Sequence, residues 1–186
     1  MRILRFISVI VGLLSLAACS NYMPAKHAFH SSLVTPYRLD TGDELRIIVF
    51  GQTDLTNTYT VDKAGTISMP LIGTVPARGR TTGEIEQDVA KRLRGGYLRK
   101  PDVAAEVARY RPIFVMGEVN AAGQYSYVAG TTIQTAIATA GGFSPRADQY
   151  RVKVTRTSNG EIESGPLGMT DPVMPGDTIY VRERIF

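Results

Sequence analysis

The sequence contains one cysteine, Cys19, two histidines and no tryptophan among its 186 residues. With a single cysteine, no disulfide can form within the chain. His27 and His30 lie together in a short N-terminal segment with no cysteine or carboxylate close to them, which makes a poor metal site and supplies no base for a nucleophile. No glycine-rich phosphate loop with a following Lys and Ser or Thr is present. We therefore expect no enzyme, no metal and no cofactor.

One catalytic arrangement stays open, because a pair of carboxylates can be brought together by folding alone, as in glycosidases. Asp43, Asp62 and Asp177 all fall at turns, where a carboxylate commonly caps backbone N–H groups. Capping therefore explains these acids without catalysis.

Excess charge of either sign is also missing. The formal net charge is +4, and removing an N-terminal leader that holds Arg2 and Arg5 lowers it to +2. Nucleic-acid binders rely on concentrated positive charge, so we expect no nucleic-acid partner. With 44% hydrophobic and 20% charged residues, the composition is that of an ordinary globular protein.

The N-terminus predicts a lipoprotein leader. Two arginines precede an apolar run over residues 6–18, which is shorter than the roughly 20 residues that a membrane-spanning helix needs. Leu16-Ala17-Ala18-Cys19 has the pattern of a lipobox, so we expect removal of residues 1–18 and lipidation of Cys19; an ordinary cleaved signal is the alternative. Ser20 stands where Asp would retain the protein at the inner membrane. These features predict an outer-membrane anchor facing the periplasm, with residues 19–35 as a tether.

Short strands and two helices predict an α+β fold made of two small mixed α/β modules. The helices are expected at 81–93, with a capping box between Thr81 and Glu84, and at 131–140, capped by Thr131 and Gln134. A hairpin-type turn with Gly65 is expected between strands 58–61 and 66–69. The remaining strands are expected at 45–50, 103–110, 113–116, 124–128, 150–155 and 178–181. A boundary near Arg111 and Pro112 divides residues 36–111 from 112–186.

Gly-Asp pairs occur before two of these strands, at Gly42-Asp43 and Gly176-Asp177. A glycine and a side-chain cap suit a tight strand entry, so the repeat indicates a structural device. The full set of expected turn residues is Gly42, Asp43, Gly65, Gly117, Gly123, Gly141, Gly142, Gly176 and Asp177.

Two ordered sets of motifs resemble the outer-membrane polysaccharide export family. The set that resembles its export domain comprises Tyr37-Arg38-Leu39, Gly42-Asp43, Phe50-Gly51, Val61-Asp62, Gly65-Thr66-Ile67, Pro70-Leu71-Ile72-Gly73, Gly79, Thr82, the helix with Ile85, Val89 and Leu93, and Tyr97 before Pro101. The set that resembles its SLBB module, a soluble ligand-binding β-grasp, comprises Val115 to Val119, Gly123-Gln124-Tyr125 and Ala140-Gly141-Gly142-Phe143. Ala64 and Ala122 depart from the usual pattern at two turns.

The resemblance implies residues 36–111 as the export domain and 112–186 as the SLBB-type β-grasp domain. It implies a non-enzymatic part of an exopolysaccharide or capsule export machine, a homo-oligomeric ring that forms part of a conduit for the glycan. The C-terminal pore helix of full-length members has no counterpart after Arg184, so we expect a short form that needs a separate outer-membrane β-barrel. An inner-membrane co-polymerase, often linked to a tyrosine kinase, is the other expected partner.

Candidate glycan contacts are Tyr125 and Tyr127, which the predicted strand places on one face. The candidate cations for an acidic glycan are Arg109, Arg111, Arg146 and Arg151. Strand packing of the tyrosines, and solvated or subunit-contacting arginines, are the structural alternatives. A periplasmic glycan-binding or scaffold module that conducts nothing is the alternative function, which ring formation would distinguish; a glycan hydrolase would need an acid pair that the sequence does not reveal.

Overall fold

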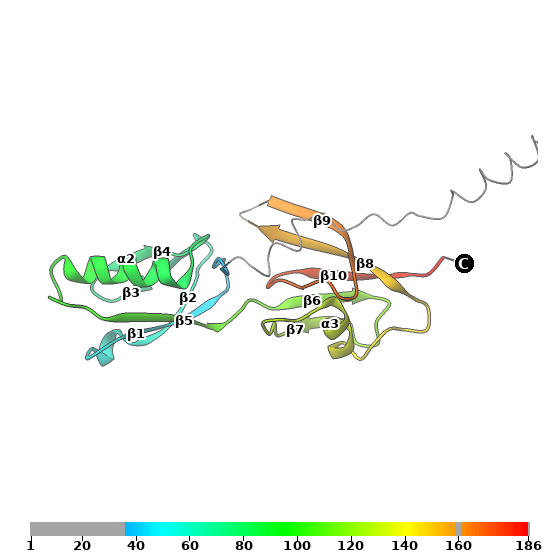
Figure 1. Cartoon of the computed structure of the whole chain (residues 1–186), viewed down its shortest axis with the longest axis horizontal. Helices are drawn as coiled ribbons and strands as arrows, with labels where there is room; N and C mark the ends of the chain where they lie inside the picture. Colours follow the sequence, from blue (N-terminus) through cyan, green and yellow to red (C-terminus); the bar gives the residue numbers. More distant parts are fainter. Residues whose placement is uncertain (1–35, 159–160, 186) are drawn as a thin grey trace, which may run out of the picture.

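Two groups of strands and helices lie end to end in the computed structural model, which describes residues 36–158 and 161–185 (Figure 1). Each group surrounds its own hydrophobic core. The buried residues of the first core lie between Leu39 and Leu93 in the sequence, and those of the second core lie between Ile113 and Val181. Within the described residues, the chain passes from one group to the other once, between strands β5 and β6. Helices and several small sheets are both present, which confirms the α+β class.

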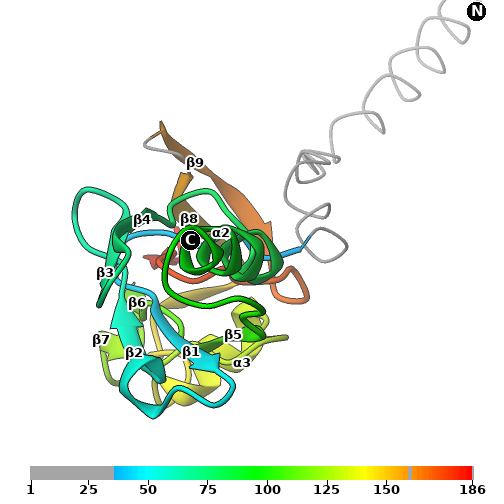
Figure 2. The ribbon, with the colours of Figure 1, turned by 90° about the vertical axis from the view of Figure 1, so that its left-hand side faces the viewer.

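The first domain has a three-stranded antiparallel sheet in the order β2-β1-β5 and a separate β3–β4 hairpin, with α2 against β5. Figure 2 shows α2 end-on, to one side of these strands. The elements are β1 (Glu44–Val49), the 3-10 turn η4 (Thr53–Leu55), β2 (Asn57–Thr60), β3 (Thr66–Met69), β4 (Gly73–Pro76), α2 (Thr82–Arg94) and β5 (Val103–Arg109).

Helix α2 follows the sequence prediction closely. Thr81 accepts from the Glu84 N–H through its side chain, and the Glu84 side chain accepts from the Thr81 N–H, which together form the expected capping box. Ile85, Val89 and Leu93 are fully buried on the face that meets the core. The every-fourth-residue apolar pattern therefore predicted both the helix and its buried face.

The second domain has a five-stranded sheet in the order β7-β6-β10-β8-β9. Strands β6 and β10 are parallel, whereas every other neighbouring pair is antiparallel. This mixed sheet with one helix is consistent with a β-grasp module. The elements are β6 (Ile113–Gly117), β7 (Gly123–Tyr125), α3 (Ile133–Thr139), β8 (Ala147–Ser158), β9 (Glu161–Gly168) and β10 (Thr178–Glu183).

The predicted pairing of strands 58–61 and 66–69 is wrong. Asp62 does form the turn, since its N–H donates to the Thr66 carbonyl and its carboxylate accepts from the Thr66 N–H. However, β2 pairs with β1, while β3 pairs with β4. The turn therefore passes the chain from one sheet to another, and β4 was not predicted because glycine and proline interrupt its short apolar pattern.

Helix α3 and strand β7 are shorter than the sequence predicted. Thr132, rather than Thr131, is the N-cap, and its side chain accepts from the Thr135 N–H. Strand β7 ends at Tyr125, so Tyr127 lies beyond it and the two tyrosines do not share a strand face. The alternating pattern over residues 124–128 predicted a longer strand. Tyr127 instead lies in the loop after β7, where its ring packs against Tyr110.

Strand β9 was not predicted, and β8 extends beyond the expected 150–155 at both ends. The two strands pair over eight positions, from Arg151 with Gly168 to Ser158 with Glu161. Glycine and proline within β9 obscure its strand pattern. None of the helices in the described part of the chain is long and apolar enough to cross a membrane.

Candidate functional site

Two equivalent turns face the boundary between the domains. In each, the N–H of the final Asp donates to the carbonyl three residues earlier at 3.1 Å: Asp43 to Asp40, and Asp177 to Met174. In each, a carboxylate oxygen of that Asp also accepts from the first residue's N–H at 2.8 Å. Positive φ at Gly42 and Gly176 is what this turn needs. The repeated Gly-Asp motif therefore builds the same turn twice.

Arg111 lies between the two turns and bonds to both. Its backbone N–H donates to Asp43 Oδ1 at 3.0 Å, and its Nη1 donates to Asp40 Oδ2 at 2.5 Å. Its Nε donates to the Pro175 carbonyl oxygen of the second turn at 2.9 Å. Only 19% of its side chain is exposed. Arg111 is therefore a link between the two domains.

Aromatic rings add a second contact across the boundary. Tyr110 packs edge-to-face on Tyr37, with ring centroids 5.0 Å apart, and on Tyr127 of the second domain at 5.3 Å. The Tyr37 hydroxyl donates to Asp43 Oδ2 at 2.7 Å. Burial, together with the nearby Asp43 carboxylate, raises the pKa of Tyr37 well above its ordinary value. The Tyr37 hydroxyl therefore keeps its proton and continues to donate to Asp43.

The two fully buried acids, Asp43 and Asp177, are hydrogen-bonded within the fold. Asp177 is completely buried and binds Arg156 through both carboxylate oxygens, at 2.8 and 2.7 Å. Asp43 is equally buried and accepts from Tyr37, Asp40 and Arg111. These bonds occupy the oxygens that an acid or base catalyst would need, so both carboxylates hold turns together. Within residues 36–158 and 161–185, no three His, Cys, Asp or Glu side chains meet in a way that could hold a metal ion.

Asp40, at the start of the first turn, is held in its charged form. Burial opposes ionisation, but hydrogen bonds from the Thr41 N–H and Arg111 outweigh it, and the charges of Arg111 and Arg78 add to them. The pKa of Asp40 is therefore lower than its ordinary value. The pairing with Arg111 consequently depends on pH in the acid range.

The remaining expected turn residues occupy several places in the fold. Positive φ angles occur at Gly65, Gly117, Gly141 and Gly142, whereas Gly123 begins β7.

The proposed glycan arginines do not form one site. Arg109 pairs with Glu44 at 3.2 Å, and Arg146 pairs with Glu118 and Glu183 at 3.3 and 3.4 Å. The Arg111 side chain is hydrogen-bonded to Asp40 and Pro175 at the domain boundary. Tyr125 donates to the Ala121 carbonyl at 2.5 Å, while Tyr127 packs at the boundary. Arg151 lines a surface hollow.

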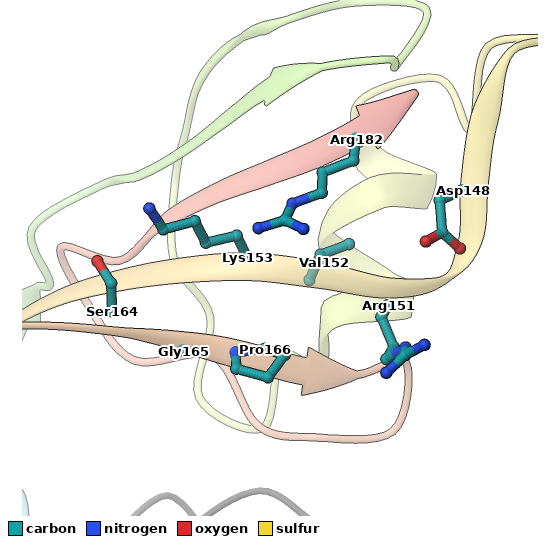
Figure 3. Close-up of a pocket in the computed structure, with 8 residues that line it drawn as sticks. All are labelled: Asp148, Arg151, Val152, Lys153, Ser164, Gly165, Pro166 and Arg182. Carbon is teal, nitrogen blue, oxygen red and sulfur yellow. The ribbon is translucent and has the colours of Figure 1, made fainter. Parts of the chain in front are cut away.

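That hollow belongs to the face of the second sheet that points away from the core. We define the outer sheet face by the exposed side chains that alternate with the buried ones on β6, β8 and β10: Phe114, Met116, Arg151, Lys153, Tyr180 and Arg182. A hollow of about 430 Å³ lies over β8, β9 and β10 (Figure 3), and one of about 600 Å³ lies over β6 and β7.

Lys153 and Arg182 extend side by side over the first hollow, with Arg151 toward the end of β9 and Asp148 at the rim (Figure 3). Ser164, Gly165 and Pro166 of β9 form its other wall. Sequence reasoning missed Lys153 and Arg182 because the pairing of β8 with β10 was not predicted and Arg182 lies beyond the expected strand 178–181. The alternation of YRVKVT and of TIYVRE, taken together, was the available signal.

Two family models match the chain in succession. The first is described as polysaccharide biosynthesis/export protein and matches residues 31–108, and the second is the SLBB domain and matches residues 112–166. The matches meet at the boundary where Arg111 lies.

Curated relatives carry matching names. The exopolysaccharide production protein ExoF of Rhizobium meliloti (strain 1021) is 32% identical over 124 residues, which cover 60% of this chain and 29% of the relative. The EPS I polysaccharide export outer membrane protein EpsA of Ralstonia solanacearum is 29% identical over 184 residues, covering 81% and 48%. The polysialic acid transport protein KpsD of Escherichia coli is 25% identical over 159 residues, covering 80% and 28%.

The chain thus spans less than half the length of each of these three relatives. The successive family matches and the shared names of the relatives confirm the resemblance seen in the sequence. The chain belongs to the polysaccharide export protein family.

Proposed function

We propose that this protein is a component of an exopolysaccharide or capsule export machine at the outer membrane, with residues 36–111 as its export domain and 112–186 as its SLBB domain. The observation that carries the proposal is the succession of the two family matches over residues 31–108 and 112–166. The name of EpsA, an export outer membrane protein, supports the location. A lipid on Cys19, facing the periplasm, would hold the protein there.

In this role the protein does not react with the glycan. It forms part of a wall past which the polymer moves, and the buried acids serve the fold. A wall element must keep its two domains in a fixed relation, which is what Arg111 and the Tyr37–Tyr110–Tyr127 contacts provide. Several copies would complete a ring, working with a further outer-membrane component and an inner-membrane co-polymerase, which in some systems is linked to a tyrosine kinase.

Deletion of the gene tests export. The deletion strain should assemble lipid-linked repeats but release little polymer, and expression of the wild-type chain should restore extracellular polysaccharide. Colorimetric assay of washed cells and medium measures both pools. Undiminished extracellular polymer in the deletion strain, with no second copy of the gene present, would exclude an export role.

Electron microscopy of the full lipidated chain, purified in detergent, separates a conduit from a scaffold. Closed rings with a central opening support the conduit. Two results together would instead favour a periplasmic binding or scaffold module: a purified protein that is monomeric and binds glycan, and a deletion strain that still exports polymer.

A further inference from the structure

The outer sheet face combines apolar and basic side chains in register. Across one row of the sheet, Lys153 lies opposite Pro166 of β9 and Tyr180 of β10, and Tyr180 lies opposite Met116 of β6. In the next row along β6, Phe114 lies opposite Thr178. Phe114, Met116 and Tyr180 are each between 41% and 46% exposed, so this apolar strip is open to solvent.

Two cations of this face are left without acidic partners. Among the described residues, neither Lys153 nor Arg182 forms an ion pair, whereas Arg109, Arg111 and Arg146 each do. Arg151 and Asp148 also line this hollow, so its charged side chains, three basic and one acidic, leave it with net positive charge. Like charges so close together repel one another, which a bound anion would relieve.

We propose that the outer sheet face binds the exported polymer, and that this polymer is an acidic glycan bearing carboxylates. The proposal rests on the proposed function and adds the substrate class to it. Carboxylates would bind Lys153 and Arg182, while the C–H faces of the sugar rings pack on Tyr180 and its apolar neighbours.

Exposure of these groups suits a moving polymer. Ion pairs at solvent-accessible sites are individually weak and are screened by salt. Each sugar can therefore dissociate quickly, which lets the polymer move on. Aromatic residues, Met and Arg are also enriched in protein interfaces, so a second copy of the chain is the competing occupant, and Lys153 is the residue of this face that fits an interface least. A glycan can contact the cations while water stays in the hollow.

Calorimetric titration of the full lipidated chain in non-ionic detergent tests the proposal. The probe is hexagalacturonate, and maltohexaose is the neutral oligosaccharide of equal length. We expect binding of hexagalacturonate only, weakened when salt rises from about 20 to about 150 mM. Lys153→Gln/Arg182→Gln should weaken it by about tenfold, since two charge-assisted contacts are lost.

The matched control is Arg94→Gln/Lys100→Gln, which removes two exposed positive charges from the first domain. It changes the net charge equally and should leave affinity within about twofold, because charges beyond a Debye length are largely screened. Melting temperatures of both variants report whether they fold. Tyr180→Ser should weaken binding without changing its dependence on salt.

Three results would overturn the proposal: equal binding of maltohexaose, equal loss in both double variants, or unchanged binding in Lys153→Gln/Arg182→Gln. Displacement of hexagalacturonate by phosphatidylglycerol micelles would assign the hollow to a lipid headgroup. A change of oligomeric state in Lys153→Gln/Arg182→Gln, without loss of glycan affinity, would assign it to a second copy. Normal export in the deletion strain contradicts the proposed function alone, since the titration is independent of export.

Discussion

Arg111 donates from Nε to the carbonyl oxygen of Pro175, 2.9 Å away and 64 residues further along the chain. This bond connects the end of the first domain to the turn that precedes the last strand of the second. The same guanidinium binds Asp40 of the first domain. One side chain at the boundary therefore contacts both repeated turns.

Arg111→Ala should uncouple the domains. The variant loses two side-chain hydrogen bonds and leaves the partly buried Asp40 without its closest cation, which should cost about 2–3 kcal/mol of unfolding free energy. Differential scanning calorimetry of the full chain should show a lower first transition and a wider separation between transitions.

The control for this variant is Arg109→Ala, which removes an arginine two positions away whose side chain is 73% exposed and paired with Glu44. An exposed pair contributes about 0–1 kcal/mol, so the thermogram should barely change. If both variants melt like wild type, Arg111 does not couple the domains.

Gly117→Ala should be severely destabilising, because a Cβ added at this position would collide with the Val181 carbonyl oxygen on the parallel strand β10. Gly51 is a matched control, since it also has a positive φ but an added Cβ would meet no atom within 4 Å. The cost of positive φ alone is about 1–2 kcal/mol, which both variants should show. Urea unfolding should reveal a clearly larger loss for Gly117→Ala; equal losses would mean that β10 shifts easily.

Acid should weaken the junction through Asp40. Its pKa in the folded protein lies below the ordinary value of about 3.9, so its stabilising effect is present above that pH and is lost as the pH falls through the folded pKa. The melting temperature of wild type should therefore decline more steeply below about pH 4 than that of Asp40→Asn. Asp88, which is paired with Arg92 and Arg80, also has a lowered pKa. Part of the acid sensitivity should therefore remain in Asp40→Asn. Parallel curves for the two proteins would contradict this assignment.

Local patterns predicted local structure well. Thr81, Glu84 and the Ile85, Val89 and Leu93 stripe specify a helix over a few consecutive turns, and the helix forms as expected. The Gly-Asp repeat predicted two strand entries for the same reason. Strand partners depend on residues far apart in the chain, and so the turn at Asp62 suggested a hairpin that does not form.

The chemistry of the arginines was beyond sequence reasoning. Arg109, Arg111 and Arg146 are candidate glycan contacts from the sequence, and folding places an acidic partner beside each of them, which the sequence did not show. Lys153 and Arg182 come together only because β8 and β10 pair, a relationship with no local signature. A sequence shows which side chains are charged. Whether a charged side chain meets an acid or stays open to a ligand depends on the tertiary structure.

Cys19→Ser tests the anchor, which lies outside the residues that the structure describes. The signal peptidase acts after the thiol is modified, so the variant should accumulate as a larger, unlipidated precursor. Growth with a radiolabelled fatty acid, followed by immunoprecipitation, should label wild type alone. Equal label in both proteins would contradict the lipobox interpretation.

Ser20→Asp is the second variant, because it should keep the lipid and change only its destination. Density-gradient separation of the membranes should move this protein from the outer to the inner membrane, while fatty-acid label stays at the wild-type amount. Export should fall in both variants, since a conduit component acts only where its effective concentration beneath the outer membrane is high. Full export by Ser20→Asp despite its relocation would show that the protein acts without outer-membrane anchoring, and the anchor would then serve retention alone.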